Sequence, residues 1–183
     1  DGDAGQTAGV LAAGAARVRG DHVAAVDLFR VALGQWPGHE DCLLYLANAL
    51  AELGQEAEAL ARLQELLQAR PDSSRAWMQV GRLHLPGGNA ALDDLERARE
   101  AFGQAHAINR EESGPLVQLG VTAMLRGADD EAERFFLDAA TLHAGSVEAR
   151  YWRGYLAWRR GDRGRAATLL QEARSLALEA AAK

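Results

Sequence analysis

Apolar residues recur every three or four positions along this chain, in stripes separated by short polar or glycine-containing segments. The clearest stripes, on either side of Gly54, are Leu43, Leu46, Ala47, Leu50 and then Ala59, Leu63, Leu66. This spacing is typical of amphipathic α-helices, in which one turn takes about 3.6 residues. Gly54 between the stripes and Pro71 after them are typical helix ends. The pattern predicts two helices joined by a tight turn, a helical hairpin.

The hairpin pattern repeats along the chain. A small residue followed four positions later by a large one occurs five times, at steps of 34, 39, 34 and 34 positions: Ala25/Phe29, Ala59/Leu63, Ala98/Phe102, Ala132/Phe136 and Ala166/Leu170. The turn glycines repeat at the shorter step, Gly20 to Gly54 and Gly127 to Gly161. A period of this length indicates stacked helical hairpins, none of which buries its apolar face alone.

One segment carries a fuller motif, with Trp77, Val80, Gly81 and His84 at the spacing W-x2-L-G-x2-Y. Together with the five small-then-large pairs and with Pro37 and Pro71, it resembles the tetratricopeptide repeat family over nearly the whole chain. The resemblance implies an all-α, right-handed α-solenoid of about five helix-turn-helix units in a single domain, 1–183. The units are expected at about 6–39, 40–73, 74–112, 113–146 and 147–183.

Two segments depart from the regular pattern. The third unit is five residues longer than the others, and the excess falls at 86–90, as a tolerated insertion or as a lid over one face. The first unit carries Gly9 and Gly14 where larger apolar residues are usual, and each glycine costs a helix interior about 1 kcal/mol relative to alanine. We expect residues 1–18 to fray.

The resemblance also implies a function, because the first helix of each tetratricopeptide unit commonly lines a concave, partner-binding surface. By phase, the expected contact positions are Leu44, Asn48, Ala51, Met78, Arg82, Val117, Val121, Met124, Tyr151, Tyr155 and Trp158. Val10 and Gly14 stand where the tail-binding members of the family carry lysine and asparagine. An apolar or amphipathic peptide or helix is therefore the expected partner, bound by a non-catalytic protein-interaction module.

Two other roles stay open. The aromatic residues of the last unit can instead cover a missing sixth repeat, pack on a following domain, or contact another copy of the chain. A self-assembling structural subunit that associates through its terminal repeats into a homo-oligomer is the alternative function, and a linker or scaffold role is the third.

The distribution of charge adds little to the prediction of fold and partner. The chain has a net charge of −6, with residues 1–73 at −6, residues 74–146 at −4 and residues 147–183 at +4. The asymmetry can steer a partner, favour head-to-tail contact between copies, or be chance. The overall charge argues against nucleic acid as a partner, although arginines lie among the aromatics near Tyr151 and Trp158.

Candidate chemistry is sparse. The five histidines are scattered and Cys42 stands among leucines, so we expect no catalytic residues, no metal site and no cofactor, and a buried thiol. The acidic run from Asp129 to Glu133 resembles a cation site only in its charge, and a helix start, where carboxylates are favoured, is the preferred explanation. No apolar run approaches the roughly 20 residues of a membrane span, so membrane insertion is not expected. A soluble chain is expected, and the sequence does not distinguish the cytoplasm from the periplasm.

Overall fold

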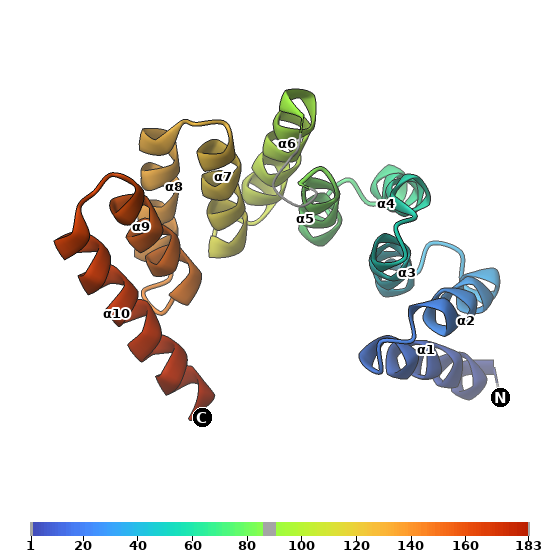
Figure 1. Ribbon diagram of the computed structural model, residues 1–183. Coiled ribbons are helices and arrows are strands. Elements are labelled where there is room, and N and C mark those ends of the chain that lie inside the picture. Colours follow the sequence, from blue (N-terminus) through green and yellow to red (C-terminus); the bar gives the residue numbers. More distant parts are fainter. Residues whose placement is uncertain (1, 86–90, 183) are drawn as a thin grey trace. The chain divides into compact units, whose positions relative to one another are not determined.

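Helices alone make up the regular structure of residues 2–85 and 91–182, the residues that the computed structural model describes (Figure 1). The chain divides into two compact units, residues 1–83 and 84–183. The first unit holds α1 (Gly2–Val18), α2 (His22–Gln35), α3 (Glu40–Glu52), α4 (Glu56–Ala69) and α5 (Ser74–Leu83). The second holds α6 (Leu92–Ile108), α7 (Ser113–Leu125), α8 (Asp129–Leu142), α9 (Val147–Arg159) and α10 (Arg163–Ala181). The all-α fold class is confirmed.

Consecutive helices pack as hairpins within each unit. In the first unit α1 packs on α2 and α3 on α4, and in the second α7 packs on α8 and α9 on α10 (Figure 1). The two helices of the third repeat, α5 and α6, fall in different units, so each is described only with its own. A single domain over 1–183 and the exact repeat bounds stay predictions.

The tight turns share one backbone geometry. Gly20, Gly54, Gly127 and Gly161 have φ between 72° and 81°, a conformation that side chains with a β-carbon rarely adopt. The residue after each glycine donates its N–H to a carbonyl in the last turn of the preceding helix, as Gln55 does to Leu50 at 2.9 Å. This is the hydrogen bond of a Schellman cap, and it confirms the predicted role of Gly54.

Several helices begin at a side-chain cap. The Ser73 hydroxyl accepts the N–H of Ala76 at 3.3 Å and donates to the carboxylate of Glu40 at 2.7 Å. Ser146 accepts the N–H of Ala149 at 3.2 Å at the start of α9. Each cap satisfies a backbone donor that the first turn leaves unpaired, so the helix start is defined locally.

The repeated small-then-large pairs form the core of each unit. In the first four pairs both side chains are fully buried, with the alanine leaving room for the neighbouring helix and the large residue filling the adjacent space. The fifth pair differs, because Leu170 is 36% exposed although Ala166 is buried. The expected packing is therefore complete in four repeats and incomplete in the last one.

The structure describes only one of the two segments that depart from the regular repeat. The expected insertion at 86–90 lies outside the described residues. Gly9 and Gly14 lie inside α1, which continues as a helix to Val18. The fraying of residues 1–18 stays a prediction.

Candidate functional site

The first helix of the last repeat, α9, carries the most exposed aromatic side chains of the described residues. Tyr151 is 47% exposed and Trp158 is 61% exposed, and Tyr155 between them is partly buried. Positions 151, 155 and 158 follow the four- and three-residue spacing of one helix face. We call these three residues the α9 aromatic face.

A fourth aromatic residue fixes this face to the core. Trp152 contacts Tyr151 edge-on, at 5.2 Å between ring centroids, and Tyr155 in the same way at 5.8 Å. Its other neighbour is the buried Phe136 of α8, against which it stacks at 6.3 Å. The rings of Tyr155 and Trp158 lie 5.8 Å apart. Because aromatic pairs prefer such offset and edge-on geometries, the exposed rings are held in place before any partner binds.

The arginines around the α9 aromatic face are paired within the second unit. On α9, Arg153 pairs with Glu133, Arg159 with Asp129 and Arg160 with Asp130, at 3.1, 3.1 and 2.8 Å. Arg150 lies 3.5 Å from Glu172, and Arg165 of α10 donates a second hydrogen bond to Glu133. The carboxylates near the start of α8 thus form ion pairs with the basic residues of the last repeat. This pairing offsets the local positive charge and leaves the aromatic rings as the main exposed chemistry.

The expected contact residues of the first unit are only partly exposed. Leu44 on α3 and Met78 on α5 are buried, whereas Asn48 is partly exposed and Arg82 is exposed. The buried pair can serve the core as well as a partner. Their role in binding stays a prediction.

In the second unit the expected positions also differ in exposure. Val117 and Met124 of α7 are buried, and Val121 is partly exposed. Helix α7 contacts α9 and ends in Leu125, which is exposed. Sequence reasoning missed Leu125 and the anchoring role of Trp152. The repeat period could have shown the latter, since Trp152 follows Phe136 at the same spacing as Tyr45 follows Phe29.

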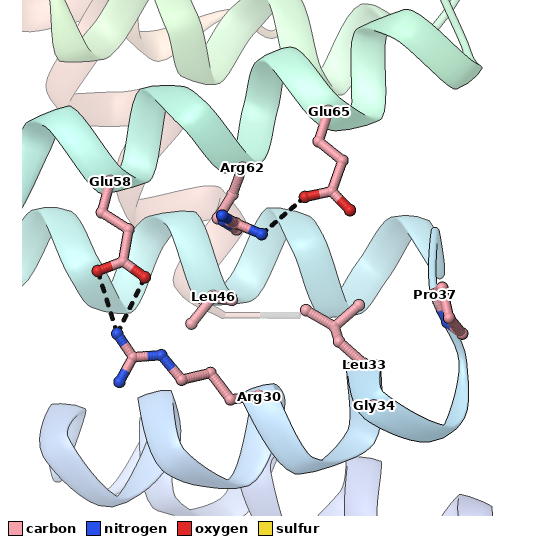
Figure 2. Close-up of a pocket in the computed structure, with 8 residues that line it drawn as sticks. All are labelled: Arg30, Leu33, Gly34, Pro37, Leu46, Glu58, Arg62 and Glu65. Atoms are coloured by element: carbon pink, nitrogen blue, oxygen red, sulfur yellow. Dashed lines mark hydrogen bonds and ion pairs between the residues drawn. The ribbon is translucent and has the colours of Figure 1, made fainter.

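The first unit contains a pocket of about 380 Å³ between α2, α3 and α4 (Figure 2). Leu33, Leu46 and Pro37 supply its apolar wall. One terminal nitrogen of Arg30 donates to both carboxylate oxygens of Glu58, at 2.9 and 3.0 Å, and Arg62 donates to Glu65 at 2.8 Å. Because these four charges pair with one another, as Figure 2 shows, the pocket lacks the unbalanced charge that would select an ionic ligand.

The remaining candidate chemistry has structural explanations. Cys42 is fully buried, and burial, with a smaller contribution from the Asp41 carboxylate, raises the pKa of its thiol. The side chain of His84 is largely buried, and its Nδ1 lies 3.5 Å from Asp94. Within residues 2–85 and 91–182, histidine, cysteine and carboxylate side chains form no group of three or more that could hold a metal ion. None of the described helices is both long and apolar enough to cross a bilayer.

Comparison with known proteins agrees with the repeat pattern. Residues 18–83 match the family profile described as Tetratricopeptide repeat. Tetratricopeptide repeat protein 36 of Homo sapiens is 36% identical over 102 residues, which are 55% of this chain and 51% of the relative. The Bos taurus protein of the same name is 35% identical over 102 residues. Residues 18–83 therefore belong to the tetratricopeptide repeat family. The chain spans about half the length of these two curated relatives.

Solved tetratricopeptide structures share the fold. A thermophilic TPR protein of Thermus thermophilus superposes with a TM-score of 0.75 at 23% identity, covering 97% of both chains. MamA from Desulfovibrio magneticus RS-1 gives 0.75 at 16% identity, covering 95% of this chain and 96% of its own. PilF of Pseudomonas aeruginosa gives 0.80 at 16% identity, covering 95% and 77%. At these identities the likeness shows the fold alone, an α-solenoid of tetratricopeptide repeats.

Proposed function

We propose that this chain is a non-catalytic interaction module that binds an apolar or amphipathic peptide or helix. The α9 aromatic face is the principal contact, extended by the exposed parts of α7. The family's general role in protein–protein interaction supports the class of function. The choice of surface is our own inference.

The exposure of Tyr151 and Trp158 carries this proposal. Burying large aromatic side chains releases free energy, and tryptophan and tyrosine are enriched among the residues that dominate binding energy. Here both are exposed: Tyr151 contacts Trp152 directly, Trp158 is linked to it through Tyr155, and Trp152 stacks on a buried phenylalanine. A preformed aromatic surface binds with a smaller loss of side-chain entropy than a mobile one.

The surrounding charge favours an apolar partner over an acidic one. Arg153, Arg159 and Arg160 already have carboxylate partners within the unit. A partner carboxylate would have to displace those partners, whereas an apolar side chain would only have to cover the rings. The preferred ligand is therefore a segment with aliphatic or aromatic side chains at helical spacing.

Selection from a library of displayed peptides tests the proposal even though the natural partner is not identified. Peptides selected on the wild-type protein are then measured by calorimetry against Trp158→Ala and against a control, Leu137→Ala. Leu137 lies on α8 in the same unit and is 45% exposed, so the control removes a comparable exposed apolar group elsewhere. We expect Trp158→Ala to weaken binding by about tenfold or more and Leu137→Ala by less than about twofold.

Circular dichroism and urea unfolding establish that both variants keep the wild-type fold. Equal affinities of folded Trp158→Ala, folded Tyr151→Ala and wild type for the selected peptides would overturn the choice of the α9 aromatic face. The same result would leave the class of function intact, because the peptides would then report another surface.

A further inference from the structure

One junction between successive hairpins in each unit has the same aromatic contact. Phe29 of α2 is fully buried, and Tyr45 of α3 lies against it with ring centroids 5.9 Å apart. Phe136 of α8 is covered in the same way by Trp152 of α9, at 6.3 Å. In both cases the covering residue lies at the same distance along the sequence, on the first helix of the next hairpin. The next hairpin thus supplies the cover for the preceding one.

In the last hairpin, the position equivalent to Phe136 is only partly covered by the described residues. Leu170 occupies the position of Phe136 one repeat later. Its inner side packs on α9, where a β-carbon added to Gly154 would lie 2.8 Å from the Leu170 Cγ. Leu170 is nevertheless 36% exposed, whereas the equivalent residues Phe29, Leu63, Phe102 and Phe136 are fully buried.

In the first hairpin, the position equivalent to Tyr45 is left largely uncovered by the described residues. Leu11 of α1 occupies the position of Tyr45 one repeat earlier, and it is 67% exposed. One turn later, Ala15 is exposed, although its equivalents Ala49 and Leu156 are buried. Val18 continues the stripe and is also exposed. Helix α1 therefore keeps an exposed apolar stripe, and Leu11 in it stands where later repeats contact the preceding hairpin.

We propose that these two ends bind each other in different copies of the chain, so that α10 of one copy packs against α1 of the next. In this contact Leu11 of the second copy covers Leu170 of the first, as Trp152 covers Phe136 within the chain. Charge does not oppose this contact, since α1 has no net charge and α10 carries +1. This contact involves Leu11 and Leu170 and not the α9 aromatic face, so its test does not depend on the proposed function.

The geometry of the contact determines the kind of assembly. The two surfaces are different parts of the chain, so the contact is head-to-tail and does not close on itself as a symmetric dimer would. We expect head-to-tail oligomers, as open chains or closed rings, whose average mass increases with protein concentration.

Light scattering coupled to size-exclusion chromatography tests the proposal on the chain and two single variants, Leu11→Asp and Leu170→Asp. Each variant blocks one end and leaves the other intact. We expect wild-type mass to rise with concentration and each variant alone to stay monomeric. A mixture of the two variants should give a 1:1 dimer, because the free α10 end of Leu11→Asp can bind the free α1 end of Leu170→Asp. Leu137→Asp, on the exposed surface of α8, is the control and should assemble like wild type.

The outcomes separate the proposal from its alternatives. A wild-type mass that stays monomeric at all concentrations up to about 1 mM overturns it. So does an oligomer that survives both variants, or a mixture that stays monomeric although both variants are folded by circular dichroism. If Leu170→Asp fails to fold, the milder Leu170→Ala takes its place, and an unchanged mass profile for that variant and for Leu11→Asp also overturns the proposal. A wild-type protein that stays monomeric but binds an additional segment at Leu170 would show that another occupant covers this end.

Discussion

Gly120 of α7 lies so close to Phe136 of α8 that a β-carbon on the glycine would be 2.4 Å from Cε1 of the ring. Real β-carbons essentially never approach another atom so closely, so the two helices owe their separation to the missing side chain. Phe136 in turn supports Trp152 and, through it, the α9 aromatic face. A glycine on α7 therefore helps to position the proposed binding surface on α9.

Substituting Gly120 should destabilise the protein. Gly120→Ala forces the Phe136 ring or the helix pair to move, which costs about 1–3 kcal/mol after the helix-propensity gain of alanine is included. Gly103→Ala on α6 is the matched control, because a β-carbon there meets nothing within 4 Å. It should stabilise the protein by up to about 1 kcal/mol. Urea unfolding of both variants measures the difference, and a Gly120→Ala variant as stable as Gly103→Ala would contradict the tight contact.

Glu133 should contribute more to stability than the other carboxylates at the start of α8. Its carboxylate accepts hydrogen bonds from both Arg153 and Arg165, and the Glu133 and Arg153 side chains are largely buried. Glu133→Gln leaves two guanidinium groups without a charged partner, and we expect a loss of about 1–2 kcal/mol in the free energy of unfolding. Asp130→Asn, which affects a nearly fully exposed carboxylate paired with Arg160, is the control and should cause no measurable change. Equal effects of the two substitutions in urea titrations would argue against a special role for Glu133.

The buried thiol predicts a dependence of stability on pH. The pKa of Cys42 is raised in the folded state, mainly by burial. Its contribution to stability is therefore fully present below the thiol pKa of the unfolded chain, about 8.5, and is lost as pH rises from there through the folded pKa. Wild type should lose more stability than Cys42→Ala between about pH 7.5 and 10. Unfolding curves that shift in parallel for the two proteins would show that the thiol is not involved.

The first helix should be the least protected element of the first unit. Gly9 and Gly14 lie in the interior of α1, and a β-carbon at either position meets nothing within 4 Å. We expect amides of α1 to exchange with solvent faster than those of α3. Gly9→Ala and Gly14→Ala should each slow this exchange, by up to about fivefold, since each glycine costs the helix up to about 1 kcal/mol relative to alanine. Protection in wild-type α1 as high as in α3 would contradict the prediction.

The sequence period was sufficient to predict the local structure of the hairpins. Gly54 and Gly127 adopt positive φ where the pattern places a turn, and Ser73 caps α5 shortly after Pro71. These features depend on residues close together in sequence, and so they are visible in a single chain. The burial of Ala25 and Phe29 follows from the same regularity.

The features of the candidate site were less predictable, because they depend on contacts between distant residues. Arg153 and Arg165 both pair with Glu133, at separations of 20 and 32 positions along the sequence. The spacing of apolar residues does not reveal either pairing. Repeat phase assigns Leu44 and Val117 to the expected contact face but does not show how far neighbouring side chains cover them. The exposure of Leu170 likewise depends on what packs beside it rather than on its place in the repeat.

The shared turn geometry has a consequence for how such a chain can change in length. At each of the four glycine turns the backbone hydrogen bond is made within the hairpin itself, and it needs no residue from a neighbouring repeat. A hairpin can therefore be duplicated or removed as one whole repeat period while the turns on either side keep their own hydrogen bonds. Insertion of only a few residues inside a helix would instead rotate its apolar stripe away from the core. Growth by whole repeats is thus the route along which this architecture can lengthen without losing its packing.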